Sequence, residues 1–202
     1  QIEGAILSSV VPPLNATILQ AVEKILGNRP LLVGSGMKTG LNILMDNPKT
    51  VGSDMIVDAV AAIHEYPKPI IVIDMGTATT MSVVDKHGNY IGGVILPGLK
   101  VSLDSLSGKT AQLPYISLST PDKVIGKNTI DCMRSGIIYG NAAQLDGIMD
   151  RMEAELGEKA SAVATGGLAK FITPLCRHQI VYDDALLLKG LLILYRKNAQ
   201  HQ

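Results

Sequence analysis

An aspartate stands at the end of the most apolar stretch of the chain. Residues 70–74 read Ile-Ile-Val-Ile-Asp, and Met75-Gly76-Thr77 follows. A carboxylate at the tip of a buried strand can hold a cation that bridges to phosphate. A glycine lets the backbone approach a ligand, and backbone N–H groups and a hydroxyl can donate to phosphate oxygens. Asp74, Gly76 and Thr77 therefore form a candidate phosphate site, with an ordinary hairpin and a surface acid as the alternative.

A second glycine turn, Thr165-Gly166-Gly167, lies between a predicted strand and a predicted helix. A nucleotide can lie on such a glycine pair near a helix N-terminus. The alternative is a tight connection that merely needs positive φ. Neither the dinucleotide GxGxxG pattern nor a GxxxxGK[ST] loop occurs, so phosphate binding here requires another fold.

A second candidate acid, Asp54, follows Gly52-Ser53 at the start of a predicted helix. It can be a simple cap or helix-dipole partner. It can also be a general base that takes the proton of a hydroxyl as that hydroxyl attacks phosphorus. The two acids then have complementary tasks, because Asp74 holds a cation and Asp54 handles a proton.

The elements that must position these residues alternate between strand and helix. Strands are predicted at 4–9, 31–33, 69–74, 81–85, 90–96, 161–164 and 179–182, the middle three forming a meander. The first helix is predicted after a stop at Pro12-Pro13, from a cap at Asn15 or Thr17 to Gly27. Further helices are predicted over 52–66, 99–107 and 168–175, and after Asp183 or Asp184. Residues 128–156 are predicted to form one or two helices. Residues 34–50 and 112–127 read as loops. This order predicts an α/β fold with a mixed sheet.

Composition argues against several classes of protein. The 202 residues carry 18 basic and 18 acidic side chains, with one Phe, six Tyr and no Trp, which disfavours nucleic-acid binding. No apolar run reaches membrane-spanning length, and no signal-peptide pattern opens the chain. The four histidines support neither a Ser–His–Asp triad nor an HExxH motif, which argues against a hydrolase or a zinc enzyme. Cys132 and Cys176 are interpreted as reduced, buried thiols, which predicts a cytoplasmic protein. From the composition and the apolar runs we expect neither nucleic-acid nor membrane partners.

Six motifs in order resemble type III pantothenate kinase over essentially the whole chain. They are Gly52-Ser53-Asp54, residues 74–80 (DMGTATT), residues 92–98 (GGVILPG), residues 110–114 (TAQLP), residues 126–129 (GKNT) and Thr165-Gly166-Gly167. The resemblance implies the acetate/sugar kinase–actin fold, with two ribonuclease-H-like halves. Residues 1–66 would be the remainder of the N-terminal half, and residues 67–202 the C-terminal half.

The resemblance also implies a function. The family uses ATP to phosphorylate pantothenate, the first committed step of coenzyme A synthesis, and works as a homodimer. It needs a monovalent cation, potassium or ammonium, besides a divalent one such as magnesium.

The family's site residues carry over by position. Asp54 matches the catalytic base that activates the pantothenate hydroxyl, and Asp74 matches the potassium ligand. Residues matching or flanking pantothenate contacts are Gly52, Ser53, Asp54, Met55 and Thr129. Residues matching or flanking ATP contacts are Gly76, Thr77, Gly166 and Gly167.

Some positions depart from the family pattern. Its DxGNT phosphate loop does not occur, and we expect that segment to lie upstream of Gln1. Met55 stands where Arg is usual, Met45 where Tyr is common, and Asp58 where Asn is common. Loss of the guanidinium and phenol donors favours two alternatives to the pantothenate kinase: a kinase for another small alcohol, or a non-catalytic regulatory relative that binds nucleotide.

Overall fold

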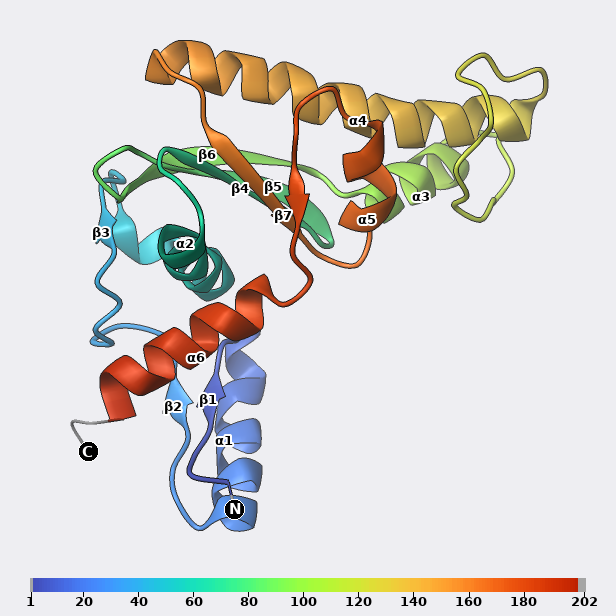
Figure 1. Ribbon diagram of the computed structural model, residues 1–202. Helices are drawn as coiled ribbons and strands as arrows, with labels where there is room; N and C mark the ends of the chain where they lie inside the picture. The colour runs from blue at the N-terminus through green and yellow to red at the C-terminus, as the bar shows by residue number, and fades with distance from the viewer. Residues whose placement is uncertain (1, 200–202) are drawn as a thin grey trace.

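A six-stranded mixed sheet organises the computed structural model, which describes residues 2–199 (Figure 1). Its strand order is β3-β6-β5-β4-β7-β8. The strands are β3 (Asn42–Ile43), β4 (Ile70–Met75), β5 (Ala78–Val84), β6 (Asn89–Pro97), β7 (Ser161–Thr165) and β8 (Val181–Tyr182). β4, β5 and β6 form the antiparallel meander predicted from the sequence, whereas β7 and β8 continue the sheet from β4 in parallel.

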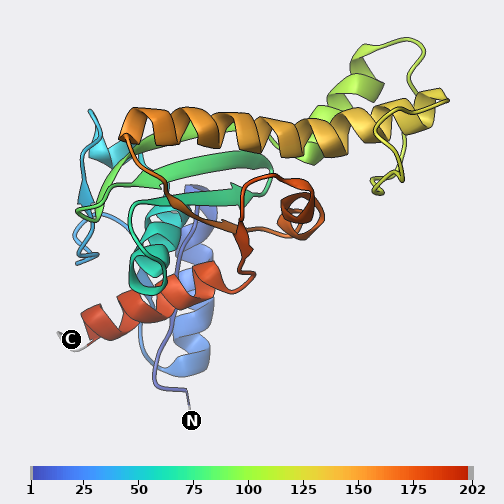
Figure 2. The ribbon, with the colours of Figure 1, turned by 45° about the horizontal axis from the view of Figure 1, so that its top comes forward.

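Helices cover both faces of this sheet, as two views show (Figures 1 and 2). α3 (Leu99–Lys109), α4 (Thr129–Leu156) and α5 (Ala169–Ile172) lie on one face. α2 (Ser53–Glu65) and α6 (Leu186–Ala199) lie on the other. The mixed α/β class predicted from the sequence is therefore confirmed.

β4 shows why the sheet needs a helix layer on each side. Successive side chains of a strand point to opposite faces. Ile71, Ile73 and Met75 enter the core cluster that includes residues of α3, α4 and α5. Ile70 and Val72 enter the cluster that includes residues of α2. The same alternation places Asp74 on the α2 side.

A smaller unit precedes the sheet. β1 (Ile6–Leu7) and β2 (Leu31–Leu32) pair in parallel, with α1 (Pro12–Leu26) between them in the chain. It joins the rest of the protein through α6, which packs against β1 and α2 (Figure 1). Gly190 of α6 allows this close approach, since a Cβ there would overlap the carbonyl oxygen of Val57 in α2.

Helix ends follow ordinary capping rules. The side chain of Asn128 accepts a hydrogen bond from the Asp131 backbone N–H at 2.9 Å and starts α4. Left-handed Gly27 and Gly157 end α1 and α4. Short 3-10 helices occupy Pro48–Thr50 and Thr173–Leu175.

Several local predictions were wrong. Pro12 and Pro13 begin α1 rather than stopping the chain before it, because proline fits the first helical turn, where its missing N–H has no partner to lose. The turn after β4 is shorter than predicted, since β5 already begins at Ala78. Cys132 is exposed, not buried. The segment 34–50 contains β3, which was not predicted.

No described helix, Pro12–Leu26 through Leu186–Ala199, combines the length and the apolar character that crossing a bilayer requires.

Candidate functional site

Asp74 occupies the end of β4, where two neighbouring strands also end or begin. It lies opposite Thr165 of β7 in parallel register and opposite Thr80 of β5 in antiparallel register. Gly76 and Thr77 follow in an exposed turn, closed by a 3.0 Å hydrogen bond from Gly76 N–H to the Ala78 carbonyl. The first glycine motif is therefore a hairpin turn with an acid at its base.

Gly166 brings the second glycine motif against the first. Its φ is +94°, a conformation that L side chains rarely adopt. A Cβ at this position would lie 2.7 Å from the Met75 carbonyl oxygen and 2.9 Å from Oδ1 of Asp74. Gly167 has open space at its own Cβ position. The structure thus joins Asp74 and Gly166, which lie far apart in the sequence.

The third motif forms the N-terminus of α2. Asp54 lies in the first turn, and its Oδ1 accepts a hydrogen bond from the Met55 backbone N–H at 2.8 Å. Gly52 leaves room for this carboxylate, because a Cβ at Gly52 would lie 2.5 Å from Oδ1. Ser53 Oγ donates to the Ser9 carbonyl at 3.1 Å and fastens the helix start to the N-terminal unit.

A further acid, Asp58, lies one helical turn after Asp54. Residues at i and i+4 share a helix face. Asp58 is 3% exposed, and its Oδ1 has no hydrogen-bond partner among the described residues. It borders a hollow of about 340 Å³ together with Asp74, Thr165, Gly166 and Gly167; residues 182, 184, 187 and 188 complete the wall.

Electrostatics shows that the three acids share one region. Burial raises the pKa of Asp58 to about 8, helped by the negative charges of Asp74, Asp54 and Asp183. Burial and the charge of Asp54 also raise the pKa of Asp74. Like charges influence one another strongly only at short range in a partly dry site. The negative charge of Asp54 therefore acts on both Asp58 and Asp74, although the residues that line the hollow do not include Asp54.

One cation next to these acids is already engaged. Lys189 Nζ donates to Asp183 Oδ2 and to Glu65 Oε2, each at 2.7 Å. Tyr66 OH also donates to Asp183 Oδ2, at 3.1 Å, and burial raises the pKa of Tyr66 to about 12. This network fastens α6 to the end of α2, below the hollow.

The side chains at the cleft fit a cation and a phosphate-bearing ligand. The buried Asp58 Oδ1 has no hydrogen-bond donor within residues 2–199, and carboxylate oxygens suit hard cations such as potassium and magnesium. The space beside Asp74 stays open only because residue 166 has no Cβ. These two observations match the chemistry predicted for Asp74 and Gly166.

Two predicted substrate residues lie apart from this arrangement. Thr129 is the first residue of α4, the helix that covers the face of the sheet opposite α2. Met55 packs its side chain against the core cluster on the α2 side of the sheet. Neither side chain borders the hollow.

The sequence analysis missed Asp58 as a site residue. Its signal was an aspartate inside the apolar run 55–62, four residues after Asp54. The wall formed by Tyr182, Asp184, Leu187 and Leu188 carried no comparable signal, because only the pairing of β8 with β7 and the packing of α6 bring it to the cleft.

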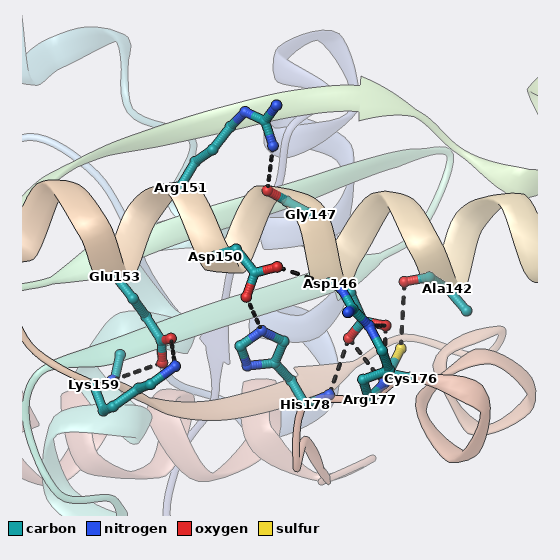
Figure 3. A network of polar contacts seen from close by, with 11 residues as sticks. Ala142, Asp146, Gly147, Asp150, Arg151, Glu153, Lys159, Cys176, Arg177 and His178 are labelled. Carbon is teal, nitrogen blue, oxygen red and sulfur yellow. Dashed lines mark hydrogen bonds and ion pairs between the residues drawn. The ribbon is translucent and has the colours of Figure 1, made fainter.

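A separate polar cluster joins α4 to the segment before β8 (Figure 3). Asp150, Glu153 and His178 offer ligand atoms within 4.8 Å of one another. However, His178 Nε2 and Asp150 Oδ1 already form a 2.8 Å hydrogen bond, and Glu153 pairs with Lys159 at 2.5 Å. Because Asp150 and Glu153 already pair with His178 and Lys159, we assign this cluster a structural role.

Comparison with known proteins adds independent information. The profile of the type III pantothenate kinase family matches residues 1–151. A type III pantothenate kinase from Exiguobacterium sp. strain AT1b is 48% identical over 198 residues, covering 98% of this chain and 78% of that protein.

A solved structure matches the fold. It is a conserved Campylobacter jejuni protein described as a candidate Baf family transcriptional activator, with a TM-score of 0.66 and 17% identity. The match covers 99% of this chain and 85% of that one. At this identity it supports the fold alone.

Proposed function

The chain belongs to the type III pantothenate kinase family, and from that premise we propose how its cleft carries out the family's reaction. The protein is a kinase that phosphorylates pantothenate in coenzyme A biosynthesis, with ATP as phosphoryl donor and a divalent cation. Its mixed α/β architecture is the actin/sugar-kinase fold class. Residues 1–66 and 67–202 are proposed as parts of its two halves.

Asp54 is proposed as the general base. It would accept the proton of the pantothenate hydroxyl while that oxygen forms its bond to the γ-phosphorus and the bond to the bridging oxygen of ADP breaks. Its place in the first turn of α2, held by the Met55 N–H and unobstructed by Gly52, supports this role. General bases contribute roughly 10²- to 10⁴-fold to rate.

Asp74 is proposed as the ligand of a monovalent cation, potassium or ammonium. Its carboxylate is half-buried at the end of β4, beside the turn that contains Gly76 and Thr77. A cation here would offset negative charge on the phosphates, which is how phosphoryl transfer is mainly catalysed. The Gly166-Gly167 corner, which packs on Asp74, is proposed to receive the nucleotide.

Gly52, Ser53 and Met55 are proposed to line the pantothenate end of the cleft through their backbone, since the Met55 side chain packs inward. Thr129 begins α4, the helix on the sheet face opposite α2. We propose that it reaches substrate from the second subunit of a homodimer.

The observation that supports these assignments is the close approach of Gly166 to Asp74, whose pKa is also raised by the charge of Asp54. The test is a coupled assay of ADP formation with pantothenate, ATP, magnesium and potassium. Turnover that requires pantothenate supports the assignment. Turnover with other small alcohols but not with pantothenate would contradict it in favour of a different acceptor.

A second candidate, a non-catalytic nucleotide-binding relative, is favoured by Met55, whose apolar side chain offers no donor to a substrate. Calorimetry with ATP and pantothenate separates the two. Nucleotide binding without turnover would favour the regulatory role.

A further inference from the structure

Asp58 is the most confined acid of the cleft. It is 97% buried, on α2, among apolar neighbours such as Val57 and Ala59, and its Oδ1 accepts no hydrogen bond from any described residue. A buried carboxylate without a partner is costly, so it must be met by a proton or by a cation. The position is therefore informative about what occupies the adjacent hollow.

The surroundings of Asp58 are acidic. Three negative charges raise the pKa of Asp58: those of Asp74 from β4, Asp54 on the same helix, and Asp183 from the segment after β8. Lys189 on α6 is held by Asp183 and Glu65. Within residues 2–199, no ion pair therefore supplies a positive charge to Asp58.

The hollow itself offers a place for a cation. Asp58 and Asp74 border it from a helix and a strand, with the buried Thr165 between the strand end and the glycine corner. Two carboxylates facing one solvent-connected space of about 340 Å³ supply the oxygen ligands that hard cations prefer. A cation held between them would offset their negative charge.

We propose that Asp58 is a second carboxylate ligand, with Asp74, of a single hard-cation site in this hollow. The inference deepens the proposed function and rests on it for the ion's role, because the cation would lie between the α2 acids and the glycine corner that receives the nucleotide. Binding of the ion itself can be measured without catalysis.

The experiment measures thermal unfolding of the whole chain at pH 8, after chelation, in titrations with MgCl₂, MnCl₂ and KCl. Tetramethylammonium chloride keeps the ionic strength constant. The proteins are the parent, Asp58→Asn, Asp74→Asn, the double variant, and Asp104→Asn as an exposed control on α3. Electron paramagnetic resonance of Mn²⁺ counts the bound ions.

The parent should gain stability with cation, and Asp58→Asn should weaken the apparent affinity about tenfold or more. The double variant should lose no more than the stronger single variant, since both acids serve one ion. Without cation, Asp58→Asn should melt above the parent, because the amide removes repulsion from the other acids.

Two results would overturn the proposal. One is a parent that shows no cation-dependent shift. The other is a shift that survives in Asp58→Asn but disappears in Asp150→Asn, which would place the ion at the cluster of Asp150, Glu153 and His178 instead. An assay of pantothenate phosphorylation on the same proteins separates the cases: an Asp58→Asn variant that loses ion binding but retains turnover rejects the ion's role in catalysis, whereas a parent protein that binds the ion without turnover rejects the kinase assignment.

Discussion

Gly166 and Asp74 lie so close that no side chain larger than hydrogen fits at residue 166: a Cβ there would be 2.9 Å from the Asp74 carboxylate. The two residues come from different strand ends, β7 and β4, which run side by side in parallel. This contact joins the two glycine motifs into one surface. Most of the predictions below concern that surface or the helix that faces it.

Gly166→Ala should impair nucleotide binding. The new methyl group would press on Asp74 and on the Met75 carbonyl, and a left-handed φ is strained for alanine. We expect about a hundredfold loss of kcat/KM for ATP, because small displacements are costly in a positioned site. Gly167→Ala is the matched control, since its Cβ position is open, and it should stay near parent activity. Equal effects of the two substitutions would refute this account.

Asp54→Asn should reduce kcat by about 10²- to 10⁴-fold, because the amide cannot accept the hydroxyl proton. The fold should survive, since Asp54 is only half-buried and the amide oxygen can still accept from the Met55 N–H. Steady-state kinetics and circular dichroism check both parts, with Asp104→Asn as the charge-matched control. Parent-like turnover would eliminate Asp54 as the base.

Asp74→Asn should weaken activation by potassium. The carboxylate supplies full negative charge to the ion, whereas the amide supplies only a dipole, so the half-activating potassium concentration should rise roughly tenfold. The measurement is activity against potassium concentration at fixed magnesium and ionic strength. An unchanged potassium curve would remove Asp74 from the cation site.

Asp183→Asn should alter stability on the acid side. Although burial opposes it, hydrogen bonds from Lys189, Tyr66 and the Ala185 N–H lower the pKa of Asp183 below its ordinary value of 3.8. A lowered folded-state pKa contributes stability above pH ~4, and that stability is lost as the pH falls through the folded pKa. The variant should be about 1–3 kcal/mol less stable than the parent near pH 6.

Unfolding in urea between pH 2 and pH 7 tests this prediction, with Asp104→Asn as control. The gap between parent and Asp183→Asn should narrow as the pH drops below 4. A gap that stays constant over this range would show that ionised Asp183 does not stabilise the fold through Lys189.

Local sequence patterns account for the secondary structure around the site. The apolar run 70–73 predicted β4, the glycines predicted the turns, and the amphipathic pattern predicted α2 within one residue at each end. These signals are short-range, because hydrophobic periodicity and turn chemistry act over a few residues. For the same reason Asp54 and Asp74 could be selected as candidates from their places at element ends.

Which of these residues lie close together depends on how the strands and helices pack in the tertiary structure. The order of strands places β7 next to β4, and so sets Gly166 on Asp74. The pairing of β8 with β7 places Tyr182, and the packing of α6 on α2 places Leu187, on the wall of the hollow that Asp58 borders. Burial then leaves one oxygen of Asp58 without a hydrogen-bond partner in the described part of the chain. Such relationships depend on contacts between residues distant in the chain, and a local pattern does not encode which faces will meet.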